Sequence, residues 1–369
     1  MLRGADPETV RAAVDSGDPL PGTAGFAGEL DGALVRDVLG RQPLFSERGA
    51  ADPSAPSAWS FDRRDLSDPM RVPAGSRRTA AGDEELWTLP TPPAETNRAA
   101  ALSAVSDAVT ESVRGVDDHG LAVAFSGGVD SAVVAAGVPD APCYVAGFEG
   151  SHDVAAARDA AAAMGRGADL RVVELTHDDI RGAVPELVSI LGRMNPMDLQ
   201  IALPLYLVGK RAAADGFDRL AVGQGADELF GGYAKVAKAP EDPRVEADTV
   251  RGAAAEMVRT LPDQLERDVL ALRAAGVEPV APLLHDRVVR AALPLPDELL
   301  VADGRRKVAL REAARGLVPE SVASVEKKAV QYGTYASREL DRLARQAGYK
   351  RRMDDHVEKY VRSLVEEER

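Results

Sequence analysis

Two glycine-rich segments of this chain carry the residue types that phosphate chemistry requires. The first, Ser126–Ser131 (SGGVDS), follows the apolar run 121–125 and precedes an alanine- and valine-rich stretch at 129–137. Two glycines let a backbone wrap closely round a ligand, and the start of the following helix offers unpaired N–H groups to an anion. The serines add hydroxyl donors, and Asp130 can hold the metal ion that accompanies a polyphosphate. A plain turn is the alternative, but strand, loop and helix together predict phosphate binding.

The second segment, Gly223–Tyr233 (GQGADELFGGY), has the same context, because it follows the apolar run 219–222 and opens a helix. Ninety-seven positions separate Asp130 from Asp227, so two strand-to-helix turns of one sheet can each offer a carboxylate. The carboxyl edge of an open parallel sheet is where such sheets bind ligands. A helix N-cap is the alternative role for Asp227.

The lysine and cysteine patterns limit the chemistry further. Eight of the 45 basic residues are lysines, and none precedes Lys210. A phosphate loop in the first half of the chain must therefore act through backbone N–H groups. The one cysteine, Cys143, excludes an internal disulfide, a CxxC pair and a zinc site with several thiolates. Its position in an apolar run predicts a structural role.

Composition and charge exclude other classes of protein. Hydrophobic residues make up 45% and charged residues 28% of the chain, as in ordinary globular proteins. The formal net charge of −14 argues against a surface that binds nucleic acid. A GC-rich genome or a salty cytoplasm can explain the scarcity of lysine, and the acid excess favours the second. No run approaches the roughly 20 apolar residues of a membrane span, and residues 1–6 lack the order of a secretory signal. We therefore expect a cytoplasmic protein with no membrane partner.

The elements that must position these segments alternate between strand and helix from about residue 95 to 235. This alternation predicts an α/β fold built on a doubly wound parallel sheet. Beyond about 245 the pattern is almost wholly helical, with prolines between the helices. Predicted strands cover 121–125, 143–146, 170–175 and 219–222, and predicted helices cover 96–113, 129–137 and 153–164.

The first 95 residues have a different character. They are rich in glycine, proline, aspartate and arginine, with short apolar pieces such as 32–36, so they predict short strands and turns. Thr91–Pro93 predicts a linker. We therefore expect a β-rich segment at 1–94 and an α/β domain at 95–369.

Both glycine-rich segments resemble those of a known family. Ser126–Ser131 matches the pyrophosphate-binding loop of the N-type ATP pyrophosphatases, which have the adenine nucleotide alpha hydrolase-like fold. Gly223–Tyr233 resembles the GEGSDEVFGGY segment of asparagine synthetases and their lactam-forming relatives. The resemblance runs from about 95 to 340. Further matching pieces are Pro204–Val208 (PMYLM in the family), Gly276–Asp286 (GVEARVPFLD), Lys307–Arg311 (KxxLR) and Lys327 with Gly333 (RxKxxxxxG).

The N-terminal part resembles an incomplete class II glutaminase domain. Leu34–Leu44 (LVRDVLGRQPL) is similar to the LVRDRLGxxPLYY strand pair of such domains, and Arg71–Gly75 resembles their PPG turn. Their nucleophilic cysteine directly follows the initiator Met, where this sequence has Leu2. The stretch before residue 22 is also too short for the missing half. We therefore expect a truncated glutaminase-like segment without glutaminase chemistry.

The resemblance implies ATP and Mg²⁺ as ligands and assigns residues to three roles. The implied metal ligands are Asp130 and Asp227, and the implied catalytic residues are Lys327, Lys307, Gln224 and Glu278. The implied nucleotide-binding residues are Phe125, Ser126, Gly127, Gly128, Asp130, Ser131, Ala146, Val222, Gly223 and Gln224.

Several of these roles have alternatives. Lys328 can replace Lys327 as the lysine that stabilises the transition state, and Lys307 can lie on a helix surface instead of contacting phosphate. Glu278 can pair with the ammonium of a nucleophile, or brace Arg311 or another helix. Three further positions have open roles: Glu228 faces substrate or supports the residues that do, His152 lies near the family's adenosine site, and Asp153 is expected to cap a helix.

The departures from the family pattern bear on the substrate. Asparagine synthetases have a glutamate where this chain has Gln224, and an arginine where it has Gln200. An arginine that forms two parallel hydrogen bonds is a typical way for a site to recognise an amino-acid carboxylate. The leading hypothesis is an ATP-dependent amide-forming synthetase that adenylates a carboxylate, with aspartate first, and uses ammonia, with a separate glutaminase as a candidate partner. The alternatives are another ligase or lactam-forming enzyme of the same superfamily, and a non-catalytic nucleotide-binding regulator.

Overall fold

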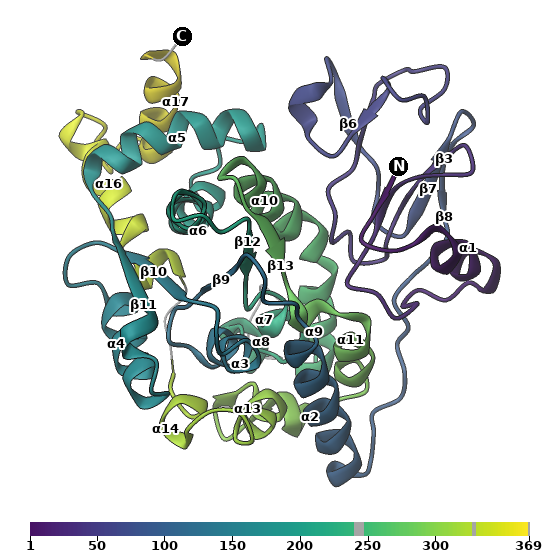
Figure 1. The fold of residues 1–369 in the computed structure, drawn as a ribbon. Coiled ribbons are helices and arrows are strands. Elements are labelled where there is room, and N and C mark those ends of the chain that lie inside the picture. The colour runs from purple at the N-terminus through teal and green to yellow at the C-terminus, as the bar shows by residue number, and fades with distance from the viewer. Residues whose placement is uncertain (240–246, 327–329, 368–369) are drawn as a thin grey trace. The chain divides into compact units, whose positions relative to one another are not determined.

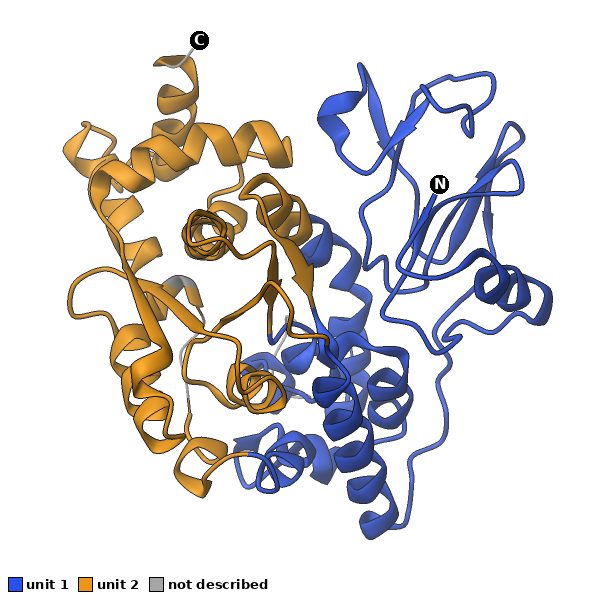
Figure 2. Cartoon of the chain, viewed as in Figure 1, with its two compact units in different colours: residues 1–116, 223–266, 281–317 blue, residues 117–222, 267–280, 318–369 orange. Residues whose placement is uncertain are grey.

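The structure is a computed structural model that describes residues 1–239, 247–326 and 330–367. The chain divides into two compact units, coloured separately in Figure 2. The edge of neither unit coincides with the boundary predicted at 94/95, so that boundary stays a prediction. No helix in the described ranges has the length and apolarity to cross a membrane. Unit 1 comprises 1–116, 223–266 and 281–317, and unit 2 comprises 117–222, 267–280 and 318–369.

Unit 2 is built on a five-stranded parallel sheet, which confirms the predicted α/β fold (Figure 1). Its strand order is β11-β10-β9-β12-β13. From β9 the chain adds β10 and then β11 on one side of the sheet, and it later adds β12 and β13 on the other side of β9. The direction in which strands are added therefore reverses between β9 and β12. The carboxyl ends of β9 and β12 therefore flank the switch point at which open sheets bind ligands. The strands are β9 (Leu121–Ala124), β10 (Cys143–Gly147), β11 (Leu170–Glu174), β12 (Arg219–Ala221) and β13 (Glu278–Val280).

Two helices of unit 2, α3 and α4, begin and end close to the predicted ranges 129–137 and 153–164. α3 is mostly buried, and α4 and α6 pack against β10. Towards the carboxyl end of the chain, α16 packs against α6 and α17 packs against α5. Its helices are α3 (Val129–Gly137), α4 (His152–Ala163), η2 (Gly167–Asp169), α5 (His177–Leu191), α6 (Pro196–Ala214), α14 (Glu320–Ala323), α15 (Val330–Gly333), α16 (Ala336–Gln346) and α17 (His356–Glu367), and α10 (Leu261–Ala274) runs through both units.

Strand β13 corrects the expectation that the chain is almost wholly helical beyond 245. Its three residues pair in parallel with β12, so the sheet gains a strand that the sequence pattern does not indicate. Pro279 stands in its middle, and a proline cannot donate to a strand ladder. It is tolerated because β13 is an edge strand with one neighbour.

The N-terminal part of unit 1 has the predicted short strands. They form two antiparallel sheets, in the orders β1-β2-β3-β7-β8 and β5-β4-β6. A cluster that includes Phe26 and Trp87 forms one small core, where the two rings meet edge to face at 5.6 Å. The strands are β1 (Leu2–Arg3), β2 (Ala27–Leu30), β3 (Ala33–Arg36), β4 (Phe45–Glu47), β5 (Trp59–Ser60), β6 (Pro69–Arg71), β7 (Ser76–Thr79) and β8 (Gly82–Glu85), with the turn η1 (Arg63–Asp65).

This part also contains a helix that was not predicted from the sequence. α1 (Pro7–Ser16) has its N-cap at Asp6, whose carboxylate accepts the N–H of Thr9 at 2.8 Å. It ends at Gly17, which has the left-handed conformation of a C-cap. An aspartate, a proline at the first position and a closing glycine are ordinary helix signals. The high glycine and proline content obscured them.

The rest of unit 1 is helical. α2 packs against α11 and α13, and α7 packs against α9. The hydroxyl of Ser112 on α2 donates to the carbonyl of Pro282 at 2.6 Å and so attaches the η3 turn. The elements are α2 (Arg98–Arg114), α7 (Ala226–Leu229), α8 (Ala234–Ala237), α9 (Val250–Arg259), η3 (Pro282–Leu284), α11 (Asp286–Ala292), α12 (Asp297–Leu300), β14 (Val301–Ala302), β15 (Arg305–Arg306) and α13 (Val308–Ala314).

Candidate functional site

The loop after β9 has the geometry of an anion-binding turn. The hydroxyl of Ser131 accepts the N–H of Ser126 at 3.2 Å and donates to the carbonyl of Gly128 at 3.1 Å. The two serine hydroxyls also lie 3.2 Å apart. Gly128 is the N-cap of α3 and gives it no side-chain cap. The first turn of α3 can therefore donate its N–H groups to a ligand.

Gly127 is required by both conformation and space. Its φ of +77° lies in the left-handed region. A Cβ at this position would also overlap with the backbone of Ala156 and Ala157 in α4. The loop is thus fixed on one side by α4 and closed on itself by the two serines. Asp130, the second residue of α3, is half-buried in the same turn.

Two further predicted nucleotide-binding residues, Phe125 and Ala146, lie at the ends of neighbouring strands. Both are buried, and Phe125 donates its N–H to the carbonyl of Tyr144 at 2.7 Å. Beyond β10, Ser151 caps α4 by accepting the N–H of Val154 at 3.3 Å. The expectation that Asp153 caps this helix is therefore wrong.

Asp153 instead lies buried where the chain passes Gly333. A Cβ at Gly333 would overlap with the carboxylate of Asp153, so only glycine allows this approach. The ring of His152, the first residue of α4, meets the ring of Tyr335 at 5.3 Å. Tyr335 has a φ of +69°, which is uncommon for a residue of its size. The glycine of the predicted RxKxxxxxG segment thus packs on α4.

In unit 1, α7 presents Asp227 to a lysine from a distant segment. Nζ of Lys307 lies 2.6 Å from Oδ1 of Asp227. Lys307 is buried and has a left-handed backbone (φ +60°) as the N-cap of α13, so its alternative role on a helix surface is wrong. The N-cap of α7 is Gly225, so the N-cap role for Asp227 is also wrong. Two residues with separately predicted roles form one ion pair.

Positive charge gathers round this ion pair. Nη1 of Arg306 donates to the carbonyl of Gly232 at 2.7 Å, and Nε of Arg311 donates to the carbonyl of Arg306 at 2.9 Å. A Cβ at Gly232 would overlap with Oδ1 of Asp227 and Cε of Lys307. Arg306 is therefore held at Gly232, and the absence of a side chain there lets Asp227 and Lys307 approach each other.

Glu228 supports the cluster from the interior. It is buried and accepts the hydroxyl proton of Tyr233 at 2.5 Å, and Tyr233 also lies 3.3 Å from Gln264. Burial, followed by the charge of Asp227, raises the pKa of Glu228. Burial and Glu228 raise the pKa of Tyr233 in turn. The sequence motif includes Tyr233, but nothing in the sequence indicated this bond.

The residues of both segments fit the ligands that the sequence analysis implies. The Ser126–Ser131 turn offers N–H groups and hydroxyls, which suit phosphate oxygens. The side chain of Asp227 is 46% exposed, so a carboxylate oxygen is accessible to a hard cation. Lys307, Arg306 and Arg311 offer the positive charge that a polyphosphate needs.

Other predicted residues occupy different positions. Gln224 is half-buried between β12 and α7, with Val222 before it buried and Gly223 half-buried. Glu278 in β13 forms a two-point ion pair with Arg273 of α10, at 2.9 and 2.6 Å. Glu278 thus braces a helix, α10, through Arg273. Lys327 and Lys328 lie outside the described residues.

The segment that departs from the family arginine lies at the start of α6. Gln200 is buried there. Its near neighbour Asp198 accepts from Nη1 of Arg267 at 3.2 Å and lies 3.8 Å from Arg193. Arg267 and Arg193, which lie close to this segment, are thus paired with a carboxylate of the chain itself.

A parallel sheet with an uncapped two-glycine turn at its switch point defines a doubly wound α/β protein with an anion-binding loop. The family model described as asparagine synthase matches residues 101–257 and 238–368. The chain belongs to the asparagine synthase family.

Named relatives agree with this family. A protein of Methanocaldococcus jannaschii, named as a glutamine-hydrolyzing asparagine synthetase, is 27% identical over 301 residues, which cover 72% of this chain and 54% of the relative. Asparagine synthetase B of Escherichia coli K12 is 25% identical over 226 residues, which cover 56% and 40% respectively. A mimivirus protein named as an asparagine synthetase is 25% identical over 243 residues, covering 62% and 42%. The chain spans about half the length of the curated relatives it matches.

Proposed function

We propose that this chain is an ATP-dependent amide-forming synthetase that adenylates a carboxylate and releases AMP and pyrophosphate. The observation that carries the proposal is the Ser126–Ser131 turn, closed by two serine hydroxyls at the carboxyl end of a central parallel strand. Membership of the asparagine synthase family supports the same reaction.

The residues of the two glycine-rich segments have different proposed roles. The Ser126–Ser131 turn binds pyrophosphate oxygens through N–H groups and hydroxyls. Asp130 and Asp227 are the proposed ligands of Mg²⁺, which when bound neutralises charge on the departing pyrophosphate. Lys307 holds Asp227 and adds positive charge. Lys327 is the proposed lysine for transition-state charge, on the basis of its spacing from Gly333.

Aspartate is the first candidate for the carboxylate, with asparagine as the product. Ammonia is the proposed nitrogen donor, because the nucleophile of a family glutaminase is a cysteine and this sequence contains one cysteine. The one cysteine, Cys143, is buried in β10. A separate glutaminase is a candidate source of the ammonia.

A second carboxylate substrate has specific support. Gln200 is buried where the family has an arginine, and Asp198 pairs with Arg267 nearby. A neutral amide in place of the arginine suits a substrate that lacks the α-carboxylate of aspartate, such as a different acid or a lactam precursor.

ATP–pyrophosphate exchange with a panel of carboxylates tests the proposal. Exchange that depends on one carboxylate, with AMP and pyrophosphate formed in equal amounts when ammonium is added, is the expected result. Asp130→Asn and Asp227→Asn should each abolish exchange, whereas Asp140→Asn, at an exposed position beyond α3, should leave it unchanged. Formation of ADP and phosphate, or ATP binding without exchange on any acid, would contradict the proposal and favour a nucleotide-binding regulator.

A further inference from the structure

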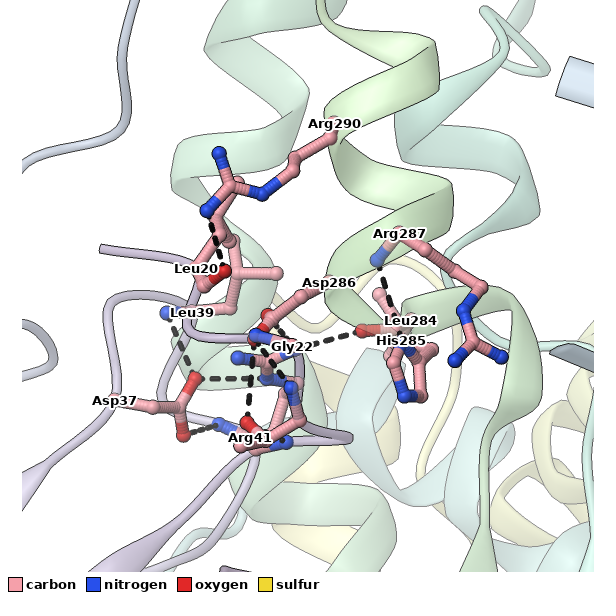
Figure 3. A network of polar contacts seen from close by, with 12 residues as sticks. Leu20, Gly22, Asp37, Leu39, Arg41, Leu284, His285, Asp286, Arg287 and Arg290 are labelled. Atoms are coloured by element: carbon pink, nitrogen blue, oxygen red, sulfur yellow. Dashed lines mark hydrogen bonds and ion pairs between the residues drawn. The ribbon is translucent and has the colours of Figure 1, made fainter. Parts of the chain in front are cut away.

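The N-terminal part of unit 1 shares a buried polar network with the start of α11 (Figure 3). The buried guanidinium of Arg41 donates from Nε to Oδ1 of Asp37 at 2.8 Å and from Nη1 to Oδ1 of Asp286 at 2.7 Å. Burial alone would lower the pKa of Arg41, but the charges of Asp37 and Asp286 outweigh it and raise that pKa. The network therefore contains one cation between two anions, in place of an apolar contact.

The same guanidinium holds the backbone of the η3 turn. Nη1 of Arg41 also donates to the carbonyl of Leu284 at 2.7 Å. On the other side, Oδ2 of Asp286 accepts the N–H groups of Gly22 at 3.0 Å and Thr23 at 2.7 Å. The N–H of Asp286 donates to the carbonyl of Thr23 at 2.9 Å. The last residue of η3 and the first of α11 are thus both held by the N-terminal part.

Arg41 is itself rigidly placed. Buried Arg36 donates to the carbonyls of Gly40 and Gln42, on either side of Arg41. Burial lowers the pKa of Arg36 to about 10, which leaves its guanidinium charged at neutral pH. A Cβ at Gly25 would overlap with the side chain of Arg41, so the stem of Arg41 packs on that backbone.

Leu284 connects this network to α7. Its side chain is buried, and a Cβ at Gly225 would overlap with Cγ and Cδ2 of Leu284. Gly225 has a φ of +88° and is the N-cap of α7, two residues before Asp227. Any shift of Leu284 therefore changes the packing at the residue from which α7 starts.

We propose that Arg41 is a positioning residue: by fixing Leu284 against Gly225, it sets the direction in which α7 presents Asp227. The catalytic meaning of this inference rests on the proposed function. The glutaminase-like segment then acts as a brace for the synthetase chemistry. Shifts of about 1 Å in such supported groups are enough to change rates strongly.

Three variants of the full chain test the proposal against a matched control. Arg41→Lys keeps the charge but reaches fewer acceptors, and Arg41→Met removes the charge. Leu284→Ala opens the packing on Gly225 without touching Arg41. The control is Arg290→Gln, because Arg290 also joins α11 to the N-terminal part, through the carbonyl of Leu20 at 2.6 Å and Asp18.

Amide hydrogen exchange without metal or nucleotide is the first readout. The reporters are the N–H groups of Leu229, Phe230 and Gly232, which donate within and just after α7. They should exchange at least about tenfold faster in the Arg41 and Leu284 variants and at wild-type rates in Arg290→Gln. The proposal is overturned if Arg41→Lys and Leu284→Ala leave these rates unchanged, or if the control raises them equally.

Two further comparisons separate the possible causes. Arg41→Met removes the charge between two buried carboxylates. If amide exchange in this variant is faster throughout β2 and β3, the variant has lost its fold, and Arg41→Lys and Leu284→Ala then decide whether Arg41 positions α7. In ATP–pyrophosphate exchange, Arg41→Lys should raise the half-saturating Mg²⁺ concentration about tenfold with a smaller change in the KM for ATP. An unchanged Mg²⁺ dependence contradicts the positioning role. If the wild type gives no exchange at all, the proposed function fails, and the amide data still decide whether Arg41 positions α7.

Discussion

Gly232→Ala is the sharpest test of the Asp227–Lys307 ion pair as part of the working site. Gly232 is buried just after α7, donates its N–H to the carbonyl of Asp227 at 2.8 Å and accepts from Arg306. Its φ does not lie in the left-handed region, so alanine is compatible with the backbone. The whole effect of the substitution therefore comes from one added methyl group, which would overlap with the carboxylate of Asp227 and with Cε of Lys307.

The size of the effect follows from that overlap. The methyl group can be accommodated only if the two side chains, which lie 2.6 Å apart, move by roughly 1 Å. A displacement of that size costs about 100-fold in rate when it falls on groups that act on the reacting phosphates, which corresponds to about 2.7 kcal/mol. The loss of stability should lie near the lower end of the roughly 1–3 kcal/mol typical of overpacking, because Asp227 is 46% exposed and can yield towards solvent.

The assay compares ATP–pyrophosphate exchange and thermal unfolding of the variant with those of Gly182→Ala. Gly182 lies in α5, and a Cβ added there would point into open space. Its replacement should stabilise the helix by up to about 1 kcal/mol and leave exchange unchanged. A folded Gly232→Ala protein that keeps more than a third of the wild-type exchange rate would refute the reasoning, because the ion pair would then not act on the nucleotide.

Three other predictions concern single side chains. Burial, followed by the charge of Arg287, lowers the pKa of His285, whose Nδ1 accepts the N–H of Arg287 at 3.2 Å. The free energy of unfolding should therefore fall as the pH drops below about 6.5. In urea unfolding, the variant His285→Asn, which caps the helix without titrating, should lack that fall. Because the pKa of Glu228 is raised, the folded chain holds a proton that the unfolded chain releases. The free energy of unfolding of the wild type should therefore fall relative to that of Glu228→Gln as the pH rises above the usual glutamate range. A constant difference between the two proteins across this pH range would argue against a raised pKa. Lys327→Met should lower the exchange rate by about 10²–10³-fold with little change in ATP affinity, and Lys328→Met should cost far less; the reverse order would place the functional lysine at Lys328.

The sequence predicts local structure well where one short pattern decides it. The strands β9 to β12 and the helices α3 and α4 lie within a residue or two of the predicted ranges, because apolar runs alternate with helical periods there. The Ser126–Ser131 turn closes over five positions, and its motif was sufficient to recognise it. Strand β13 was missed because Glu278–Val280 is short and contains a proline.

Long-range pairings could not be predicted in this way. Arg41 and Asp286 are 245 positions apart, and nothing in either segment indicates the other. Lys307 was expected to contact phosphate, but its ion pair with Asp227 depends on how α13 packs within unit 1. Such pairs depend on the three-dimensional arrangement of elements, and composition and periodicity do not carry that information.

The buried cysteine of β10 gives the chain an internal reporter of unfolding. Cys143 is fully buried at the start of β10, an inner strand of the parallel sheet, and burial raises the pKa of its thiol to about 11. Only an exposed thiolate attacks an alkylating reagent, so the native chain should resist alkylation at neutral pH. The labelling rate under native conditions should therefore measure how often the sheet opens. Each ligand that binds only the folded chain should slow that labelling in proportion to its occupancy.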